Sequence, residues 1–384
     1  MIVLVQMGKQ VYIGGVKLYS KKLREHLQHY EKGDYLKVEC PDSKSEKVLV
    51  DCSFGVNPFG HSENIKIYNV DKYIDISNYS ELGAFRIRKV IIDNWHSIVK
   101  LGYDNLAISD GSMGIIDSIN SLFINAGDRV LGYSPQFPEF VESLKIRGGI
   151  YEPVLLAEDK NYKFNADNII DRLRENVYKL VYIDNPNNPT GQIIPIQEIE
   201  WIIKKADEAN TIVVVDEAYG DYMPKGNSAM KLIGKYGNFY VIKSFSKAYS
   251  LAGIRIGYVA GSDELMRYYS IIDDYLVNQV AVNITEIALN DKAFLEKTIE
   301  KTIYVKTDIL NSINKLKILE TDMRVPIFTA VCGDKSINLY KLMRSLGINT
   351  SSGFHNLGGN SVRIRIPKES EKFKELIKKL EEKI

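Results

Sequence analysis

Short apolar runs in this chain end repeatedly in clusters of polar residues, and segments with helical spacing separate one run from the next. Runs such as residues 212–215 are apolar throughout, as expected of strands that are covered on both faces in a parallel sheet. This alternation predicts a doubly wound α/β domain with a mostly parallel sheet. The expected strands lie at 105–109, 129–133, 179–184, 211–219 and 240–242, and helices are expected at 111–123, after Pro135 and at 196–210.

The rest of the chain predicts a smaller second domain. A helix is expected from Ser80 onward, and apolar spacing predicts one long helix over 283–313, followed by mixed helix and strand patterns. We therefore expect three parts: an N-terminal segment (1–62) that packs with the small domain, a large α/β domain (63–275), and a small α+β domain (276–384).

Charge and cysteine content exclude several classes of protein. Lys and Arg total 50 against 49 Asp and Glu, which gives no electrostatic reason to expect a nucleic acid or membrane partner. The 3 cysteines are too few and too scattered for a disulfide framework or a zinc site, and the 5 histidines show no metal-ligand spacing. The first apolar stretch is far shorter than a membrane span, and no basic region precedes it. We expect a cytoplasmic protein without a metal site, signal peptide or membrane span.

The polar clusters that follow the expected strands should converge on one site, because ligands of open parallel sheets bind at the carboxyl ends of the strands. The last cluster contains Ser244, Ser246 and Lys247, and Arg255 follows it. Burial and nearby cations disfavour the ammonium form of a lysine, so Lys247 suits covalent attachment of an aldehyde. The two serines and Arg255 suit a phosphate, as does the helix start at 111–113, with its free backbone N–H groups.

Four residues of the other clusters suit an aromatic ring at the same site. Asp216 ends a buried strand and can hold a pyridine nitrogen protonated, which makes the ring an electron sink. Tyr219 and Asn188 can bond to a ring hydroxyl, and Phe137 can stack on the ring face. A position in the core is the alternative for Phe137.

The stretches NPNNPTG, VVDEAY, SFSKAYSLAGIRIGY and VRIRIP resemble the motifs of the class I and II pyridoxal-phosphate-dependent aminotransferases, in order and at family spacing. Within that family the sequence is most similar to the histidinol-phosphate aminotransferase branch and to the related threonine-phosphate decarboxylases. The resemblance implies fold type I, pyridoxal 5'-phosphate (PLP) as the cofactor, and amino transfer between an L-amino acid and a 2-oxo acid.

The same resemblance implies roles for single residues. Lys247 matches the Schiff-base lysine, Asp216 the partner of the pyridine nitrogen, and Tyr219 a third catalytic residue. Arg363 matches the arginine that binds a substrate α-carboxylate, with Arg365 on the same strand as the alternative, and Asn57 is implied as a second substrate-binding residue. The rest of the cofactor-binding set is Gly111, Ser112, Met113, Phe137, Asn188, Ser244, Ser246, Arg255 and Tyr79.

Two further expectations concern assembly and substrate. The implied site lies at a subunit boundary, so we expect a two-fold symmetric homodimer in which Tyr79 reaches the cofactor phosphate of the other subunit. Ser80 stands where the family usually has a proline. In the histidinol-phosphate branch an arginine about a dozen residues before the carboxylate arginine holds the substrate phosphate, whereas this chain has Ser351 and Ser352 there. We therefore predict a non-phosphorylated amino acid substrate, with decarboxylation as the alternative reaction.

Two other classes require features that the sequence lacks. Residues 244–247 satisfy the S-x-x-K motif of penicillin-binding enzymes, but neither S-D-N nor K-T-G occurs downstream. A PLP-binding transcriptional regulator would carry an added DNA-binding domain, whereas about 50 residues precede the VNPFG turn, without a basic helix-turn-helix pattern.

Overall fold

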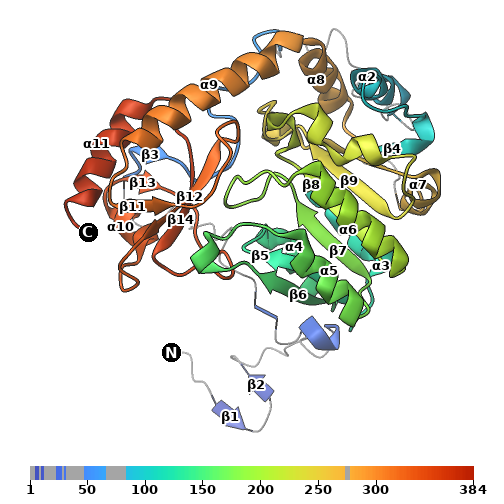
Figure 1. Cartoon of the computed structure of the whole chain (residues 1–384), viewed down its shortest axis with the longest axis horizontal. Coiled ribbons are helices and arrows are strands. Elements are labelled where there is room, and N and C mark those ends of the chain that lie inside the picture. Colours follow the sequence, from blue (N-terminus) through green and yellow to red (C-terminus); the bar gives the residue numbers. More distant parts are fainter. Residues whose placement is uncertain are drawn as a thin grey trace.

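The computed structural model describes residues 5–7, 10–12, 23–27, 30–31, 47–65, 84–272 and 277–384 (Figure 1). Figure 1 shows a large sheet with its helices beside a smaller group of C-terminal elements, and the long helix α9 (Lys292–Asn311) runs along the top of that group. Among these residues, no helix combines the length and the apolar character needed to cross a bilayer.

Seven strands form the large sheet, in the order β4-β10-β9-β8-β7-β5-β6. Strand β10 runs antiparallel to both of its neighbours, and the other strands run parallel to one another. The predicted mostly parallel sheet is therefore confirmed. The strands are β4 (Leu106–Ser109), β5 (Arg129–Ser134), β6 (Ile150–Leu155), β7 (Leu180–Asp184), β8 (Ile212–Glu217), β9 (Phe239–Ser244) and β10 (Gly257–Gly261).

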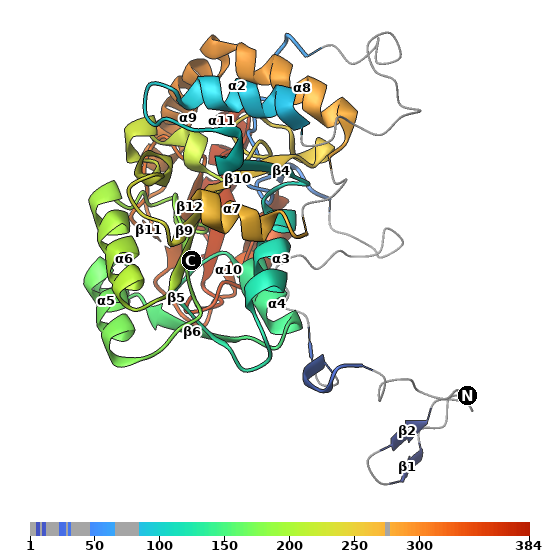
Figure 2. The ribbon, with the colours of Figure 1, turned by 90° about the vertical axis from the view of Figure 1, so that its right-hand side faces the viewer.

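Helices cover both faces of this sheet, which Figure 2 shows nearly edge-on. In β8, Val214 packs on one face with α3 (Ser112–Phe123), α4 (Pro138–Ile146) and α7 (Asp263–Tyr269). Val213 and Val215 pack on the other face with the second set of helices. Cover on both sides explains why the central strands are continuously apolar. The second set is α2 (Phe85–Trp95), α5 (Ala166–Glu175), α6 (Ile196–Glu208) and α8 (Gln279–Asn290).

The C-terminal elements form a second, smaller core around a three-stranded antiparallel sheet in the order β11-β12-β14. Strand β3 (Val50–Asp51) of the N-terminal segment pairs in parallel with β13 (Ile348–Asn349), which brings residues just before the VNPFG turn onto this part of the molecule. The remaining elements here are β11 (Leu316–Ile318), β12 (Ile327–Cys332), α10 (Leu339–Ser345), β14 (Ser361–Arg365) and α11 (Ser370–Glu381).

The expected long helix over 283–313 is wrong, because the chain leaves the helical conformation at Asp291 (φ −84°, ψ 82°), between α8 and α9. The Asp291 carboxylate accepts a hydrogen bond from the Ser62 hydroxyl (2.5 Å), so the break is tied to the N-terminal segment. Helix α8 packs in the core of the large sheet, although the expected boundary at residue 276 assigned it to the small domain. The three-part division itself stays a prediction.

Short elements complete the described chain. Strands β1 (Val5–Met7) and β2 (Gln10–Tyr12) form an antiparallel hairpin. The expected helix start at Ser80 lies outside the described residues. The short 3₁₀ helices are η2 (Glu25–Leu27), η6 (Tyr103–Asn105), η7 (Glu158–Lys160), η8 (Gly220–Tyr222), η9 (Lys225–Asn227), η10 (Ala229–Leu232) and η11 (Ala252–Ile254).

Candidate active site

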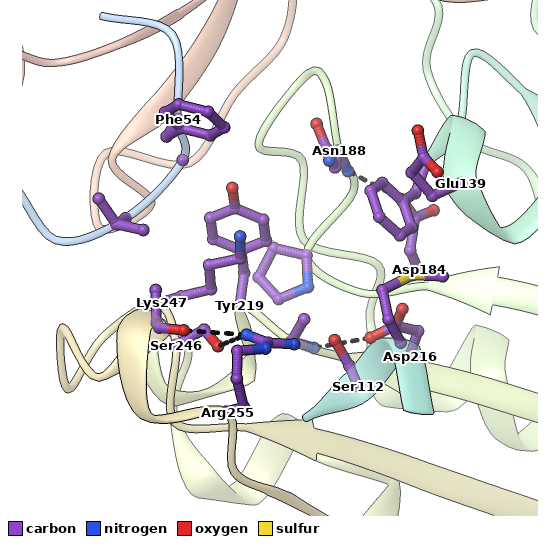
Figure 3. Close-up of a pocket in the computed structure, with 17 residues that line it drawn as sticks. Phe54, Ser112, Glu139, Asp184, Asn188, Asp216, Tyr219, Ser246, Lys247 and Arg255 are labelled. Carbon is purple, nitrogen blue, oxygen red and sulfur yellow. Dashed lines mark hydrogen bonds between the residues drawn. The ribbon is translucent and has the colours of Figure 1, made fainter. Parts of the chain in front are cut away.

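A cavity of about 260 Å³ lies at the carboxyl ends of the parallel strands, where side chains from several elements face one another (Figure 3). Strands β7 and β8 end in cavity residues, and the loop after β9 supplies two more. The parallel sheet thus brings together polar clusters that are far apart in the sequence. The predicted residues that line the cavity are Ser112, Met113, Phe137, Asn188, Asp216, Tyr219, Ser246, Lys247 and Arg255.

Lys247 projects into this cavity from the loop that follows β9. Part of the Lys247 residue is exposed to solvent, whereas its amino group is surrounded by protein atoms. Burial lowers the pKa of Lys247 to about 8, the positive charges of Arg363 and Arg255 act in the same direction, and the Asp216 carboxylate opposes them. The Lys247 Nζ lies 5.4 Å from the centre of the Tyr219 ring. A neutral, nucleophilic amine is therefore accessible near neutral pH.

Asp216 presents a buried carboxylate at the end of β8. The Tyr182 hydroxyl donates to its Oδ2 (2.6 Å), and the Ala218 backbone N–H donates to its Oδ1 (2.9 Å). Burial raises the pKa of Asp216, although these bonds and the nearby lysines oppose the shift. A buried carboxylate of this kind favours a cation beside it, because a positive partner offsets the cost of desolvation.

An anion-binding corner lies at the start of α3, beside Arg255. Gly111 precedes the helix with φ +94°, and Ser112 is its first residue, so the first backbone N–H groups of α3 lack helical partners. Arg255 donates to the Asp110 carbonyl (3.2 Å) and, more weakly, to the Ser246 hydroxyl (3.5 Å). A Cβ at Gly111 would lie 2.7 Å from Arg255 Nη2, so glycine is what allows the guanidinium to approach this turn. Donors and positive charge thus meet at one end of the cavity.

Asn188 joins the cavity to Arg363 of β14. Its side-chain Oδ1 accepts a hydrogen bond from Arg363 Nη1 (2.9 Å), and its backbone N–H donates to the Asp184 carboxylate (2.8 Å). Arg363 is 2% exposed and is not among the residues that line the cavity, yet its charge lowers the pKa of Lys247. A second bond, from Arg363 Nη2 to the Ser351 hydroxyl (2.8 Å), fixes the other end of the guanidinium.

Two predicted residues take positions behind the cavity wall. Asn57 donates from its side chain to the Ala248 carbonyl (2.9 Å), accepts from the Phe59 N–H (2.9 Å), and donates its backbone N–H to the Lys247 carbonyl (3.1 Å). These bonds use both polar atoms of the side chain to hold the segment of Lys247, and substrate contact by Asn57 stays a prediction. The buried Ser244 hydroxyl accepts from the Ser246 N–H (3.2 Å), so phosphate contact by Ser244 also stays a prediction.

Comparison with protein families gives the decisive match. The model of the aminotransferase class I and II family matches residues 76–380. The chain belongs to this family. The predicted family is therefore confirmed, and so is its cofactor, PLP. Family membership also makes the protein an aminotransferase that acts on amino acid and 2-oxo acid substrates.

Individual relatives agree with this assignment. The histidinol-phosphate aminotransferase of Clostridium novyi (strain NT) is 29% identical over 331 residues, which cover 85% of this aminotransferase and 89% of the relative. The solved histidinol-phosphate aminotransferase of Sinorhizobium meliloti in complex with pyridoxal-5'-phosphate superposes with a TM-score of 0.74 at 22% identity, over 87% of this chain and 92% of that one. A Thermus thermophilus aspartate aminotransferase mutant gives a TM-score of 0.78 at 18% identity, over 94% and 98%. Both structures show the fold, which confirms fold type I.

The cavity of this aminotransferase fits PLP by the chemistry of its donor set. Lys247 presents an amine suited to the cofactor aldehyde, and the buried Asp216 suits a protonated ring nitrogen. The corner formed by Ser112, Ser246 and Arg255 suits the phosphate, and only a glycine at position 111 leaves this corner undistorted. Tyr79, the predicted residue from the other subunit, lies outside the described residues.

Several cavity residues were not singled out by sequence reasoning. Phe54, Gly55 and Val56 line the cavity just before the predicted Asn57, and Glu139 lines it from the first turn of α4. A Cβ at Gly55 would lie 1.7 Å from the Tyr219 hydroxyl oxygen, so glycine allows Tyr219 to contact this backbone. The sequence offers one indication that these residues line the cavity: they stand within three positions of the predicted residues Asn57 and Phe137.

Proposed function

We propose that this aminotransferase moves an amino group from a non-phosphorylated L-amino acid to a 2-oxo acid, as a cytoplasmic homodimer. The observation that carries the substrate proposal is the bonding of Ser351, which stands where the phosphate-binding arginine of the histidinol-phosphate branch is expected. Its hydroxyl accepts from Arg363 Nη2 (2.8 Å) and donates to the Ser53 carbonyl (2.9 Å). Ser351 thus supports Arg363 and offers no positive charge to a substrate phosphate.

Each residue of the cavity has a separate role toward the cofactor in this proposal. Bound PLP supplies an electron sink that lowers the barrier to breaking a bond at the substrate Cα. Lys247 holds the cofactor aldehyde and later acts as the base that takes the proton from Cα, a task suited to an amine with a lowered pKa. Asp216 stabilises the positive charge of the ring nitrogen. Tyr219 and Asn188 would donate to the ring oxygen, and Phe137 would supply an aromatic face for the ring.

The fixed position of Arg363 favours amino transfer over decarboxylation. Its guanidinium is held by Asn188, by Ser351 and by the Ser53 carbonyl, so it provides a rigid partner for a substrate α-carboxylate. A carboxylate paired with Arg363 is retained, which leaves the Cα–H bond to be broken near Lys247. Loss of carbon dioxide would require the carboxylate to leave this partner.

A panel of amino donors tests the reaction and the substrate class together. The purified protein with PLP is incubated with single L-amino acids, histidinol phosphate and threonine phosphate, and 2-oxo acids and carbon dioxide are measured. We expect a 2-oxo acid from at least one free amino acid. Faster turnover of either phosphorylated compound would contradict the substrate proposal, and carbon dioxide without a 2-oxo acid would replace amino transfer by decarboxylation.

The proposed homodimer and the proposed cytoplasmic location are supported by different observations. Fold type I sites lie at a subunit boundary, and the low cysteine content suits a reducing compartment. Light scattering at working concentration should give twice the mass of the 43.6 kDa chain. A fully active monomer would contradict the dimer.

A further inference from the structure

Asp216 shares the cofactor cavity with a second buried carboxylate, that of Asp184. Asp184 ends β7 and lies in register with Asp216 of the neighbouring strand β8. Its hydrogen-bond donors are neutral groups, among them the Tyr133 hydroxyl (2.6 Å), the Asn188 backbone N–H (2.8 Å) and the Asn187 side chain (3.2 Å). The end of the sheet that faces the cavity thus holds two carboxylates side by side.

Asp216 has fewer donors than its neighbour. Among the described residues it accepts two hydrogen bonds, from the Tyr182 hydroxyl to Oδ2 (2.6 Å) and from the Ala218 backbone N–H to Oδ1 (2.9 Å). Neighbouring strands lie about 4.8 Å apart, so the two carboxylates repel each other when both are ionised, and the charge of Asp216 raises the pKa of Asp184. Burial raises the pKa of Asp216, and the bond from Tyr182 is the largest influence that opposes this rise. The ionised form of Asp216 therefore depends strongly on Tyr182.

Tyr182 is held rigidly in the position from which it donates. It is fully buried in β7, and its ring stacks on that of Phe140 in α4, with ring centres 3.6 Å apart and planes at 7°. Burial and the negative charges of Asp216 and Asp184 raise the pKa of Tyr182 well above its ordinary value, so the hydroxyl keeps its proton and acts as a donor. Tyr182 is not among the residues that line the cavity, and any effect on the cofactor must pass through Asp216.

We propose that Tyr182 is a positioning residue that keeps Asp216 ionised and correctly oriented, so that the proton of the bound cofactor remains on its ring nitrogen. The Tyr182 hydroxyl holds Oδ2 while the Ala218 N–H holds Oδ1, which fixes the plane of the carboxylate. Without the hydroxyl, the buried carboxylate takes up a proton more readily, and the ring loses part of its positive charge. The ring then withdraws electrons from the substrate less strongly. The inference rests on the proposed function, in which Asp216 is the partner of the ring nitrogen.

The first test compares two forms of the cofactor. Apoprotein is titrated with PLP and with deazapyridoxal 5'-phosphate, in which C–H replaces the ring nitrogen; both compounds keep the aldehyde that Lys247 attacks. The unaltered protein should bind PLP at least about 100-fold more tightly, because the analogue leaves the buried Asp216 carboxylate without a positive partner. Tyr182→Phe keeps the ring that stacks on Phe140 and removes only the hydroxyl, and it should lower this preference about 10-fold.

Tyr240→Phe is the matched control for this comparison. The Tyr240 hydroxyl is also buried and also donates a bond of 2.6 Å, but its acceptor is the Leu265 carbonyl, and Tyr240 does not line the cavity. This variant should keep the full preference for PLP. If Tyr182→Phe keeps it too, or if both variants lose it equally, the inference is overturned while the role of Asp216 stands. If the unaltered protein binds both compounds equally, Asp216 does not pair with the ring nitrogen, which contradicts the proposed function as well.

The second test observes the proton of the ring nitrogen. NMR of bound PLP labelled at this nitrogen distinguishes a protonated from an unprotonated ring. We expect the resonance to move toward the unprotonated value in Tyr182→Phe and to stay unchanged in Tyr240→Phe. With an amino donor, Tyr182→Phe should lower kcat about 10-fold with little change in KM, since the groups that bind the substrate are untouched. An unchanged resonance in Tyr182→Phe, or a rise in KM without a fall in kcat, would overturn the inference.

Discussion

Arg363 and Asn188 lie 175 positions apart in the sequence and share a hydrogen bond of 2.9 Å, from Nη1 of the arginine to Oδ1 of the asparagine. This bond joins β14 of the small sheet to the NPNNPTG loop at the end of β7. It places a proposed substrate ligand and a proposed cofactor ligand in direct contact. A change at Arg363 should therefore affect mainly substrate binding, whereas a change at Asn188 should affect the binding of both cofactor and substrate.

Replacement of Arg363 by lysine should weaken substrate binding and spare the cofactor. Lysine keeps the charge but cannot bond at once to Asn188, Ser351 and a carboxylate, because it lacks the planar fork of arginine. We expect KM for the amino donor to rise about 10- to 100-fold with little change in PLP affinity. Asn188→Ala is the matched comparison and should weaken both, because Asn188 also lines the cofactor cavity. Equal loss of PLP from both variants would contradict this division.

The pH dependence of PLP attachment should report the environment of Lys247. Because burial and two arginines lower the pKa of Lys247 to about 8, the neutral amine becomes more abundant as pH rises through that value. The rate at which apoprotein attaches PLP should rise about tenfold between pH 7 and pH 9 and then level off. A lysine with an ordinary pKa would give about a hundredfold rise without a plateau.

Arg363→Gln provides the control for this profile. Arg363 is the second-largest cause of the lowered pKa, so removal of its positive charge should raise the pKa of Lys247 and move the profile to higher pH. An unchanged profile would show that Arg363 does not act on the lysine. Covalent attachment at Lys247 itself is checked by borohydride reduction and peptide mapping.

Gly111→Ala should reduce PLP affinity through Arg255. The new Cβ would lie 2.7 Å from Arg255 Nη2, so the guanidinium must move away from the proposed phosphate site. We expect a loss of roughly 10-fold or more in PLP affinity, measured by titration of apoprotein. Gly127→Ala is the control, since Gly127 has a similar φ of +90° but no atom within 4 Å of the added Cβ. An equal loss of affinity in both variants would assign the effect to backbone strain alone.

The sequence predicted the parts of the fold that depend on local pattern. The continuous apolar run in β8 was recognised because both faces of the central strands are covered. Strand β6 was missed, since its position at the sheet edge leaves Ile150 and Leu155 exposed and removes the apolar run. The break between α8 and α9 was also missed, because both helices continue the same apolar spacing and only Asp291 interrupts them.

The candidate site was predictable where a strand ends and less so elsewhere. Asp216 lies at the end of β8 and Lys247 lies in the loop just after β9, so topology alone brought them together. Glu139 and Phe54 face the cavity through the start of a helix and through a turn, and sequence does not show which way such side chains point. The side chain of Asn57 bonds to the Ala248 carbonyl, 191 positions away, and a contact between such distant residues is not visible in the sequence.

Lys306 should contribute to stability through a buried shell of oxygens. Its Nζ lies within hydrogen-bonding distance of four oxygens, to three of which an ammonium group can donate at one time. They are the Thr321 hydroxyl (2.7 Å) and the backbone carbonyls of Asp322 (2.7 Å), Val325 (2.8 Å) and Ile327 (2.9 Å). Lys306→Met keeps the length of the side chain but removes the amine donors from this shell, in which the Ile327 carbonyl also accepts a bond from the Thr321 hydroxyl (3.2 Å). We expect unfolding by urea to require about 2–4 kcal/mol less free energy than for the unaltered protein.

The effect of Lys306 should extend to the cofactor site. The loop that Lys306 holds also donates the Asp322 N–H to the Gly191 carbonyl (3.0 Å), at the end of the NPNNPTG motif. A loosened loop therefore releases a support of Asn188, and PLP retention should fall together with stability. Lys297→Met, at an exposed position of the same helix, is the matched control and should change neither quantity. If Lys306→Met is as stable as this control, the four oxygens are satisfied without the ammonium group, and α9 does not hold the loop through Lys306.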